Sequence, residues 1–513
     1  MGALLCCAVP DASPAIRRVK SVGRLRLIGH DLRVTPAVPT PGLEELRLYD
    51  TRTRRVRTFE PLHPPTVGIY TCGPTVYAPQ TLGNMRSQLF PDLLRRTLMA
   101  AGYDVTFVTN ITDVGHLVAD TDDGDDKMEV AAAEAGKTAA EIADLYTEQW
   151  ADDRRRLGCL EPDIRPKAAA HIAEQIAMIQ VLEAKGHTYV VDDGVYFDVS
   201  TFPRYADFAG LQLDDLATSG RVEHIEAKRH PADFALWKRT PRDITRQQEW
   251  DSPWGRGFPG WHIECSAMAT KYLGDDFDIH TGGIDHVRIH HTNEVAQSEC
   301  ALDVHPWVRT WMHGEFLGLS GEKISKSAGH VLVVDSLVER GIDPLAFRYF
   351  FLQAHYRQQQ AFTWAAVEAA ATAHRRLLGH AVAARDAGGD PDQAKVEPHL
   401  RRFWSALADD LNAPQALAAL WDTVRAADLD PADLWAFLVD ADRSLGLGLA
   451  DAVAPAADES GSDPRIDALV ADREAAREAK DFATSDRIRD DLAAEGIELV
   501  DTPTGSAWRR TAR

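Results

Sequence analysis

Val67–Thr71 (VGIYT), followed by Cys72–Pro74 (CGP), is the stretch of sequence that decides the fold. Its five residues form an apolar run of the length of a buried strand, and the glycine and proline end that run in a loop. A helical pattern follows from about Met85 to Ala101, and then the β-rich run Val105–Thr109 (VTFVT). Strand, helix and strand of these lengths make a βαβ unit, so we expect an α/β fold with a parallel sheet.

Outward from this unit, the α/β pattern extends over residues 45–357. An insertion at about 129–258 is first helical and then rich in short strands separated by glycine and proline. The preceding residues 1–44 carry several prolines and arginines without a secretory signal pattern. We expect them to form a loosely ordered extension, or to reflect a misassigned start codon.

The C-terminal third has a different character. Alanine and leucine at helical spacing predict an all-α unit over 358–449. Residues 450–464 are rich in alanine, proline, serine and glycine, and this composition predicts a linker. Residues 465–513 predict further helices followed by a short polar tail.

The composition excludes several classes of protein. The 513 residues include 56 Lys+Arg and 78 Asp+Glu, which give a net charge of −22, and 45% are hydrophobic. This is too apolar for a mainly disordered chain, and no apolar run reaches the ~18 residues of a membrane-spanning helix. Six cysteines are too few for a disulfide scaffold and indicate thiols or metal ligands. Any contact with a nucleic acid must be local and basic, because the body of the chain is acidic.

A candidate nucleotide site follows the first strand. Cys72–Tyr77 (CGPTVY) and Thr81–Asn84 (TLGN) come between that strand and its helix, where an open parallel sheet binds phosphate or adenine. Gly83 would allow a flat base to approach, and Thr81 and Asn84 would donate hydrogen bonds to phosphate oxygens. A separate cationic segment, Gly321–Ser327 (GEKISKS), is called the lysine loop below. It could gather around a triphosphate and stabilise departing pyrophosphate.

A third group of residues has the chemistry of a metal site. His290 and Glu294 are spaced i, i+4 and therefore share one face of a helix. With Cys72 and Cys265 they would make a chemically sound zinc shell. His280 and His291 are rival ligands, and free cysteines are also common as plain buried residues.

The residues that carry a resemblance to a known family are the runs Leu46–Asp50, Tyr70–Tyr77, Asn110–Asp113, Asp233–Lys238, Pro259–Met268, His290–His291 and Asn293–Glu299, the lysine loop, and Asp501–Pro503, Gly505 and Trp508. Through them the sequence resembles the cysteinyl-tRNA synthetases, members of the class I aminoacyl-tRNA synthetases. The resemblance implies a Rossmann-like catalytic domain over 45–357 with an inserted subdomain, followed by an all-α anticodon-binding domain over 358–449.

The resemblance also implies the activity and its site. Cysteine would be activated by ATP, with Mg²⁺, to cysteinyl-adenylate and then transferred to the 3′ end of tRNA(Cys). The implied zinc ligands are Cys72, Cys265, His290 and Glu294, and the implied cysteine pocket is Thr112, Trp261 and His280. The implied phosphate and ATP contacts are Thr81, Gly83, Asn84, Gly283, Asp285, Lys323, Ser325, Lys326 and Ser327. We expect a cytoplasmic monomer without a membrane partner.

The sequence departs from the family pattern at several positions. The family's H-I-G-H is Thr81–Asn84 (TLGN), its H-G-G-G is His280–Gly283 (HTGG), and its H-H-E-N-E is His290–Glu294 (HHTNE). His330 stands where the family has asparagine after the lysine loop. Losing one donor to the reacting charge can cost about 2.7–4 kcal/mol, so these departures indicate a divergent member.

Two other functions remain open from the sequence. One is the related cysteine ligase of mycothiol synthesis, which shares the zinc site and the lysine loop but lacks a complete C-terminal tRNA-binding part. The other is a catalytically weak tRNA-binding paralogue, which the altered TLGN motif favours and the intact lysine loop opposes. Candidate residues for anticodon contact in the C-terminal part are Arg477, Asp486, Asp501 and Trp508.

Overall fold

The computed structural model describes residues 40–115, 126–211, 228–241, 246–319, 331–453, 464–478, 481–495, 497–502 and 505–510. Within these residues no helix is both long enough and apolar enough to cross a membrane. Of the expected N-terminal extension, residues 40–44 are described and belong to the folded chain. Leu43 is buried, and the hydroxyl of Thr40 donates a hydrogen bond to the carbonyl oxygen of Ala100. The expectation for residues 1–39 lies outside the described part of the chain.

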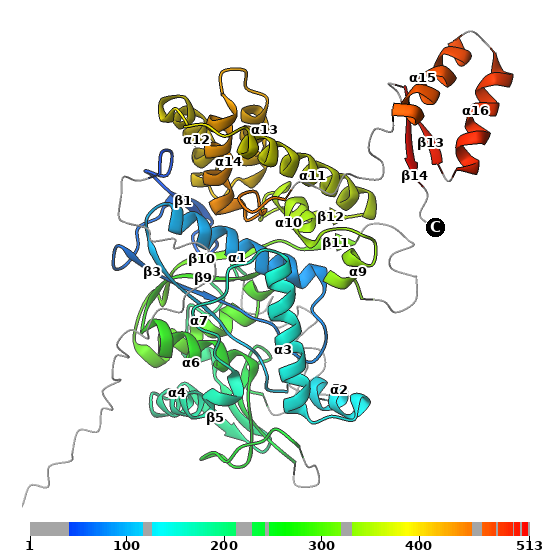
Figure 1. The fold of residues 1–513 in the computed structure, drawn as a ribbon. Coiled ribbons are helices and arrows are strands. Elements are labelled where there is room, and N and C mark those ends of the chain that lie inside the picture. The colour runs from blue at the N-terminus through cyan, green and yellow to red at the C-terminus, as the bar shows by residue number, and fades with distance from the viewer. Residues whose placement is uncertain are drawn as a thin grey trace, which may run out of the picture. The chain divides into compact units, whose positions relative to one another are not determined.

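The expected βαβ unit is confirmed. Strand β3 (Thr66–Thr71), helix α1 (Leu82–Ala100) and strand β4 (Asp104–Thr109) follow one another, and β3 and β4 pair in parallel (Figure 1). Strands β9 (Phe277–Gly283) and β10 (Val308–Gly314) complete a four-stranded parallel sheet in the order β10-β9-β3-β4. The carboxyl ends of these strands therefore meet at one edge of the sheet, where an open α/β fold binds its ligands.

The two faces of this sheet belong to different cores, because successive residues of a strand point to opposite faces. Ile69 packs in a core with α1 and the C-terminal helices, whereas Tyr70 packs in a core with α6 (Trp261–Leu273) and α7 (His290–Leu302). The side chains of Ile69 and Tyr70 are both fully buried. The near-continuous apolar run of this strand thus reflects burial on both faces.

The insertion has the predicted two-part character. Its helices are α2 (Lys127–Ala135), α3 (Ala139–Arg156), the short η1 (Ala168–His171) and α4 (Ile172–Ala184). An antiparallel sheet follows, in the order β5-β6-β7-β8, formed by β5 (Thr188–Val191), β6 (Gly194–Phe197), β7 (Phe234–Arg239) and β8 (Gly257–Pro259), with the short η2 (Val199–Thr201) after β6. Strand β8 ends directly before α6, so the insertion returns the chain to the parallel sheet.

Smaller elements frame the sheet. The hairpin of β1 (Arg47–Asp50) and β2 (Arg55–Thr58) lies against β10, where the Thr51 amide donates to the Trp311 carbonyl. Behind the lysine loop come α9 (Val334–Val338) and α10 (Pro344–Leu352), and β11 (Leu317–Leu319) pairs in parallel with β12 (Gln360–Phe362). The first residues of the expected all-α unit thus form a strand.

The expected all-α unit is otherwise confirmed as α11 (Trp364–Ala387), α12 (Gln393–Ala408), α13 (Ala413–Val424) and α14 (Pro431–Leu445). Its core is continuous with that of α1, through residues such as Phe403, Phe437 and Leu98. The expected linker, 450–464, follows the end of α14, and within it Ala452 is buried and its carbonyl oxygen accepts a hydrogen bond from Arg385. Residues 454–463 of the linker are not among the described residues.

The C-terminal part corrects one prediction. Two helices are present as expected, α15 (Pro464–Glu478) and α16 (Phe482–Ala494), but the polar tail is a β-hairpin. Strands β13 (Ile497–Thr502) and β14 (Gly505–Arg510) pair in antiparallel register. Ile497 packs with Ile466 and Leu492 of the two helices, and Leu499, two residues further along the strand, packs against the same core, so this small unit has a core of its own.

Candidate active site

Four of the candidate ligands meet at the carboxyl edge of the parallel sheet. Cys72 directly follows β3, Cys265 lies in α6, and His290 and Glu294 lie one turn apart at the start of α7. Their side-chain ligand atoms all lie within 4.8 Å of one another, and all four residues are buried. The topology thus brings together residues that are up to 222 positions apart in the sequence (294 − 72).

The rival ligands lie beside this group. Cys72, His280, His291 and Glu294 form a second set whose ligand atoms also lie within 4.8 Å of one another. The Cys72 sulfur is 3.2 Å from Nε2 of His291, and Nε2 of His280 is 3.0 Å from Oε2 of Glu294. His280 is held flat against the ring of Trp311, with ring centroids 4.5 Å apart.

The donor set of the first group fits a zinc ion. Two sulfurs, one imidazole nitrogen and one carboxylate oxygen are ligands that Zn²⁺ accepts in a four-coordinate shell. Oε1 of Glu294 lies 2.9 Å from Nε2 of His290, yet this buried oxygen accepts no hydrogen bond. One lone pair of the group, on Oε1 of Glu294, therefore has no well-aligned donor, and a cation would complete it.

The protonation of the cluster supports this reading. Burial favours the neutral form of Glu294, but the nearby His280 and His290 lower its pKa to about 2. Burial likewise disfavours charge on His290, but Glu294 and Cys265 raise its pKa to about 10. A hydrogen bond from Cys72 lowers the pKa of Cys265, whereas burial raises that of Cys72. The group thus holds the Glu294 carboxylate and the Cys265 thiol, which is prone to ionise. Beside them lies a proton on His290 that a metal would displace.

Histidines that the sequence reasoning missed surround these ligands. Nδ1 of His262 is 2.9 Å from Nδ1 of His290, and Nδ1 of His291 is 2.7 Å from Nε2 of His313. The other ring nitrogen of His313 is 2.7 Å from the hydroxyl of Thr51. Such partners fix the tautomer and orientation of a ligating imidazole. The available signal was the presence of His262 in the same run as Cys265; no sequence signal pointed to His313 or Thr51.

The expected cysteine pocket adjoins the cluster. The ring of Trp261, the first residue of α6, lies 4.4 Å from that of His290. Thr112 is buried and accepts a hydrogen bond from the amide of Asn110, whose oxygen accepts from the backbone amide of Gly73 at 2.9 Å. A side chain at Gly73 would place Cβ 1.6 Å from the carbonyl oxygen of Asn110, so only glycine fits there. Asn110 is a positioning residue that the sequence reasoning did not single out.

The candidate phosphate site is the start of α1. Thr81 caps this helix, its hydroxyl accepting from the Asn84 amide at 3.0 Å, and the Asn84 side chain donates to Gln80 at 2.9 Å. A Cβ at Gly83 would meet only the Thr81 hydroxyl oxygen, at 3.4 Å, so the surface above this glycine is open. The amides of Leu82 and Asn84 already have acceptors, but the helix start carries a partial positive charge and no acidic residue in its first turn, which suits an anion.

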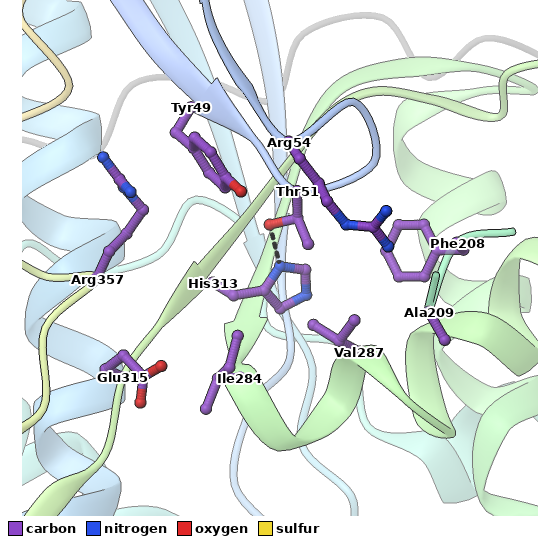
Figure 2. Close-up of a pocket in the computed structure, with 10 residues that line it drawn as sticks. All are labelled: Tyr49, Thr51, Arg54, Phe208, Ala209, Ile284, Val287, His313, Glu315 and Arg357. Atoms are coloured by element: carbon purple, nitrogen blue, oxygen red, sulfur yellow. Dashed lines mark hydrogen bonds between the residues drawn. The ribbon is translucent and has the colours of Figure 1, made fainter. Parts of the chain in front are cut away.

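The candidate ribose site is the turn after β9. Gly283 precedes the short helix η3 (Ile284–Val287), and a Cβ on it would lie 2.4 Å from Oδ1 of Asp285. A cavity of about 290 Å³ adjoins this turn (Figure 2). Its lining residues are Tyr49, Thr51, Arg54, Phe208, Ala209, Ile284, Val287, His313, Glu315 and Arg357. Thr51 and His313, which share a hydrogen bond, line this cavity, and the other ring nitrogen of His313 contacts His291.

Comparison with known proteins identifies the family. The family model described as "tRNA synthetases class I (C) catalytic domain" matches residues 58–372, and the one described as "Cysteinyl-tRNA ligase anticodon binding domain" matches residues 459–509. The cysteine–tRNA ligase 1 of Burkholderia lata is 48% identical over 462 residues, which cover 90% of this chain and 96% of that protein. The chain belongs to the class I cysteinyl-tRNA synthetases.

Other relatives agree with this assignment. The cysteine–tRNA ligase of Treponema denticola is 39% identical and covers 91% of this synthetase and 99% of its own length. Among solved structures, a methionyl-tRNA synthetase of Mycobacterium tuberculosis with bound methionyl-adenylate has a TM-score of 0.50 at 16% identity. The match covers 78% of this chain and 95% of that one, and it shows the class I fold.

Some expected site residues of this synthetase lie outside the described chain or in a separate part. The lysine loop, with Lys323, Ser325, Lys326 and Ser327, is not among the described residues. In the C-terminal part, Arg477 lies on α15 and Asp486 on α16, where the Asp486 carboxylate pairs with Arg489 at 3.0 Å. Asp501 and Trp508 lie on β13 and β14. The matched anticodon-binding model falls on this part, beyond the bundle α11–α14.

Proposed function

We propose that this chain is a cysteine–tRNA ligase, which joins L-cysteine to the 3′ end of tRNA(Cys) with ATP as the source of energy. The observation that carries the proposal is the convergence of Cys72, Cys265, His290 and Glu294 at the sheet edge where β3 ends and the chain leads into α1. A thiol-binding centre and a phosphate-binding helix start are the two recognition elements that cysteine activation requires. The relatives named cysteine–tRNA ligase support the same activity.

The reaction has two steps and needs no nucleophile from the protein. The cysteine carboxylate attacks the α-phosphate of ATP, which gives cysteinyl-adenylate and pyrophosphate. The terminal ribose hydroxyl of tRNA then attacks the adenylate carbonyl carbon, and AMP leaves. Catalysis therefore consists of positioning the reactants and stabilising the charge that develops on phosphate oxygens.

Substrate selection takes place at the cysteine cluster. Cys72, Cys265, His290 and Glu294 would hold a zinc ion, which supplies a soft Lewis acid for the substrate's thiolate. Trp261, Thr112 and His280 are assigned to the cysteine pocket, which the ring contact of Trp261 with His290 and the burial of Thr112 and His280 support. Serine is rejected because its hydroxyl ionises far less readily than a thiol and is a poor ligand for a soft site.

Nucleotide binding is assigned to the start of α1, the turn after β9 and the lysine loop. Thr81, Gly83 and Asn84 contact the phosphates, and Gly283 and Asp285 hold the ribose. Lys323, Ser325, Lys326 and Ser327 gather around the triphosphate and stabilise pyrophosphate as it leaves. Mg²⁺ accompanies ATP as part of the substrate.

Recognition of tRNA is assigned to the C-terminal half. The bundle over 358–449 and the unit over 465–513 would contact the tRNA, with Arg477, Asp486, Asp501 and Trp508 as candidate anticodon contacts. The matched anticodon-binding model over 459–509 supports tRNA as the acceptor. It weighs against an amino-sugar acceptor of the mycothiol type. We further propose that the enzyme acts as a cytoplasmic monomer.

The experiment that tests this function is charging of a tRNA(Cys) transcript by the zinc-loaded chain with labelled cysteine and ATP. The proposal expects label on tRNA and none on a glucosamine–inositol acceptor. Label on the amino-sugar alone would establish the mycothiol-type alternative. Binding of tRNA without any charging would establish the inactive paralogue.

A further inference from the structure

Asp92, in the middle of helix α1, is a buried carboxylate on which several parts of the chain converge. It is 1% exposed. Its oxygens accept from Arg348 at 2.6 Å, from Arg96 at 2.8 Å and from the backbone amide of Leu160 at 2.7 Å. Burial opposes its charge, but the two arginines hold the pKa of Asp92 well below its usual range. The carboxylate is therefore ionised and fully paired.

The two arginines extend this pairing to other elements. Arg348 of α10 donates to the carbonyl oxygens of Leu445, at the end of α14, and of Leu157, in the insertion. Arg96 of α1 donates to the carbonyl oxygens of Gly158 and Arg443. One carboxylate thus joins α1 to the insertion, to α10 and to the last helix of the bundle.

The same helix begins at the candidate phosphate site. The amide of Leu82 donates to the carbonyl oxygen of Leu332, just behind the lysine loop, and Arg86 donates to the carbonyl oxygen of Gln358 at 2.8 Å. At 1.5 Å per residue, Asp92 lies about 16 Å along the helix from Thr81. Pro91 removes one backbone hydrogen bond of α1, but the remaining bonds of the helix still connect Asp92 to its N-terminus, so a shift at Asp92 is passed on to that end.

We propose that Asp92 is a positioning residue for the nucleotide site. By fixing α1 against α10 and α14, it sets where Thr81, Gly83 and Asn84 stand relative to the ATP phosphates. The inference rests on the proposed nucleotide-binding role of the α1 N-terminus. It adds that the bundle α11–α14, which lies outside the site, fixes the position of that N-terminus through the buried carboxylate of Asp92.

The same helix offers a matched control. Arg95 is 7% exposed and pairs with Asp163 at 2.9 Å, and the Asp163 carboxylate also accepts the amide of Phe107. This pair ties α1 to β4 and to the chain that follows Leu160, and within the described residues its hydrogen bonds include none to α10 or α14. Asp163→Asn therefore removes a carboxylate that pairs with an arginine of α1, without releasing the helix from the bundle.

The test is equilibrium dialysis of ATP, without cysteine, against the full-length zinc-loaded chain. Asp92→Asn is expected to weaken ATP binding about tenfold, and the milder Arg96→Gln about threefold, as for positions that act through contact networks. Asp163→Asn is expected to stay within about twofold of wild type. The zinc content of all three variants is expected to equal that of the wild type, because no proposed zinc ligand lies on α1. Circular dichroism identifies a temperature at which all the proteins are folded.

Two results would overturn the inference: equal weakening by Asp92→Asn and Asp163→Asn, or wild-type ATP affinity in both Asp92→Asn and Arg96→Gln. If Asp92→Asn does not fold, Arg96→Gln against Asp163→Asn decides the question alone. The proposed function fails separately, when wild type binds ATP but does not charge tRNA, and the comparison of ATP affinities remains decisive in that case. A wild-type chain that does not bind ATP overturns both.

Discussion

The chain contains two buried clusters of ionisable side chains that differ in whether their members satisfy one another. At Asp92, a carboxylate is paired with two arginines at 2.6 and 2.8 Å. At Glu294, thiols, imidazoles and a carboxylate converge, and one carboxylate oxygen accepts no hydrogen bond. The difference teaches that burial of charge does not by itself mark a binding site. Lone pairs that converge without enough donors do mark one, whereas a closed set of ion pairs holds elements together.

The largest expected effect comes from removing a ligand of the group Cys72, Cys265, His290 and Glu294, called the open cluster because one of its oxygens accepts no hydrogen bond. Cys265→Ser removes a thiolate donor, so we expect loss of bound zinc and a fall in cysteine-dependent ATP–pyrophosphate exchange of about 10³-fold, which corresponds to several kcal/mol. Cys300→Ser, at another buried cysteine that lies outside both ligand sets, is the control and should retain zinc. Full zinc content and exchange in Cys265→Ser would show that this thiol is an ordinary buried residue.

A substitution in the closed cluster, formed by Asp92, Arg96 and Arg348, should instead lower the free energy of unfolding. Asp92→Asn leaves two buried arginines with less compensating charge, and breaking such a pair costs about 3–5 kcal/mol. We expect a lower midpoint of thermal unfolding with unchanged zinc content. An unchanged midpoint would mean that the pairing at Asp92 contributes no net stability.

Acid should sharpen the same contrast. Because the folded-state pKa of Asp92 is depressed, its stabilisation is fully present above its unfolded pKa of about 3.9. That stabilisation is lost as the pH falls below this value, because the unfolded chain then binds a proton that the folded chain excludes. The difference in thermal midpoint between wild type and Asp92→Asn is therefore expected to shrink from pH 5 to pH 3. A difference that stays constant over this range would contradict the assignment of the low pKa.

A smaller effect is expected at His262, which contacts a proposed zinc ligand but is not one itself. His262→Phe removes the nitrogen that lies 2.9 Å from His290, so zinc affinity should fall about 10–100-fold, as for other partners of metal ligands. Competition with a chromogenic chelator measures this, and His380→Phe on the distant helix α11 is the control. Equal affinities in both variants would show that His262 does not orient His290.

The smallest effect is expected at the other ion pair of α1. The side chain of Asp163 is 42% exposed, so its pair with Arg95 is partly screened by water. Asp163→Asn should cost about 1 kcal/mol or less and lower the thermal midpoint less than Asp92→Asn does. A larger loss than at Asp92 would reverse the ranking of the two ion pairs.

The fold could be predicted where periodicity and turn residues agree. The β3-α1-β4 unit, the two-part insertion and the helices of the bundle follow from apolar patterns that the structure confirms. The hairpin β13–β14 was missed because β13 has apolar and polar residues mixed and β14 is mostly small or charged, and its pairing and its packing against α15 and α16 are tertiary contacts. Tertiary contact of this kind leaves little trace in local sequence.

The site could be predicted only in part for a related reason. Cys72, Cys265, His290 and Glu294 carry recognisable chemistry, and the fold brings them together. Asn110 and His313 act through contacts with residues that are far away in the sequence, and the local sequence around them does not reveal these contacts. The roles assigned to Lys323 and Lys326 remain predictions.

The most direct test of the central claim is ATP–pyrophosphate exchange by the zinc-loaded wild-type chain, with cysteine and with serine as alternative substrates. The account predicts exchange with cysteine and none measurable with serine, together with loss of the cysteine-dependent exchange when a chelator removes zinc and its return when zinc is restored. Equal exchange with both amino acids, or cysteine-dependent exchange that persists without zinc, would contradict the claim that the open cluster selects the substrate through its thiol.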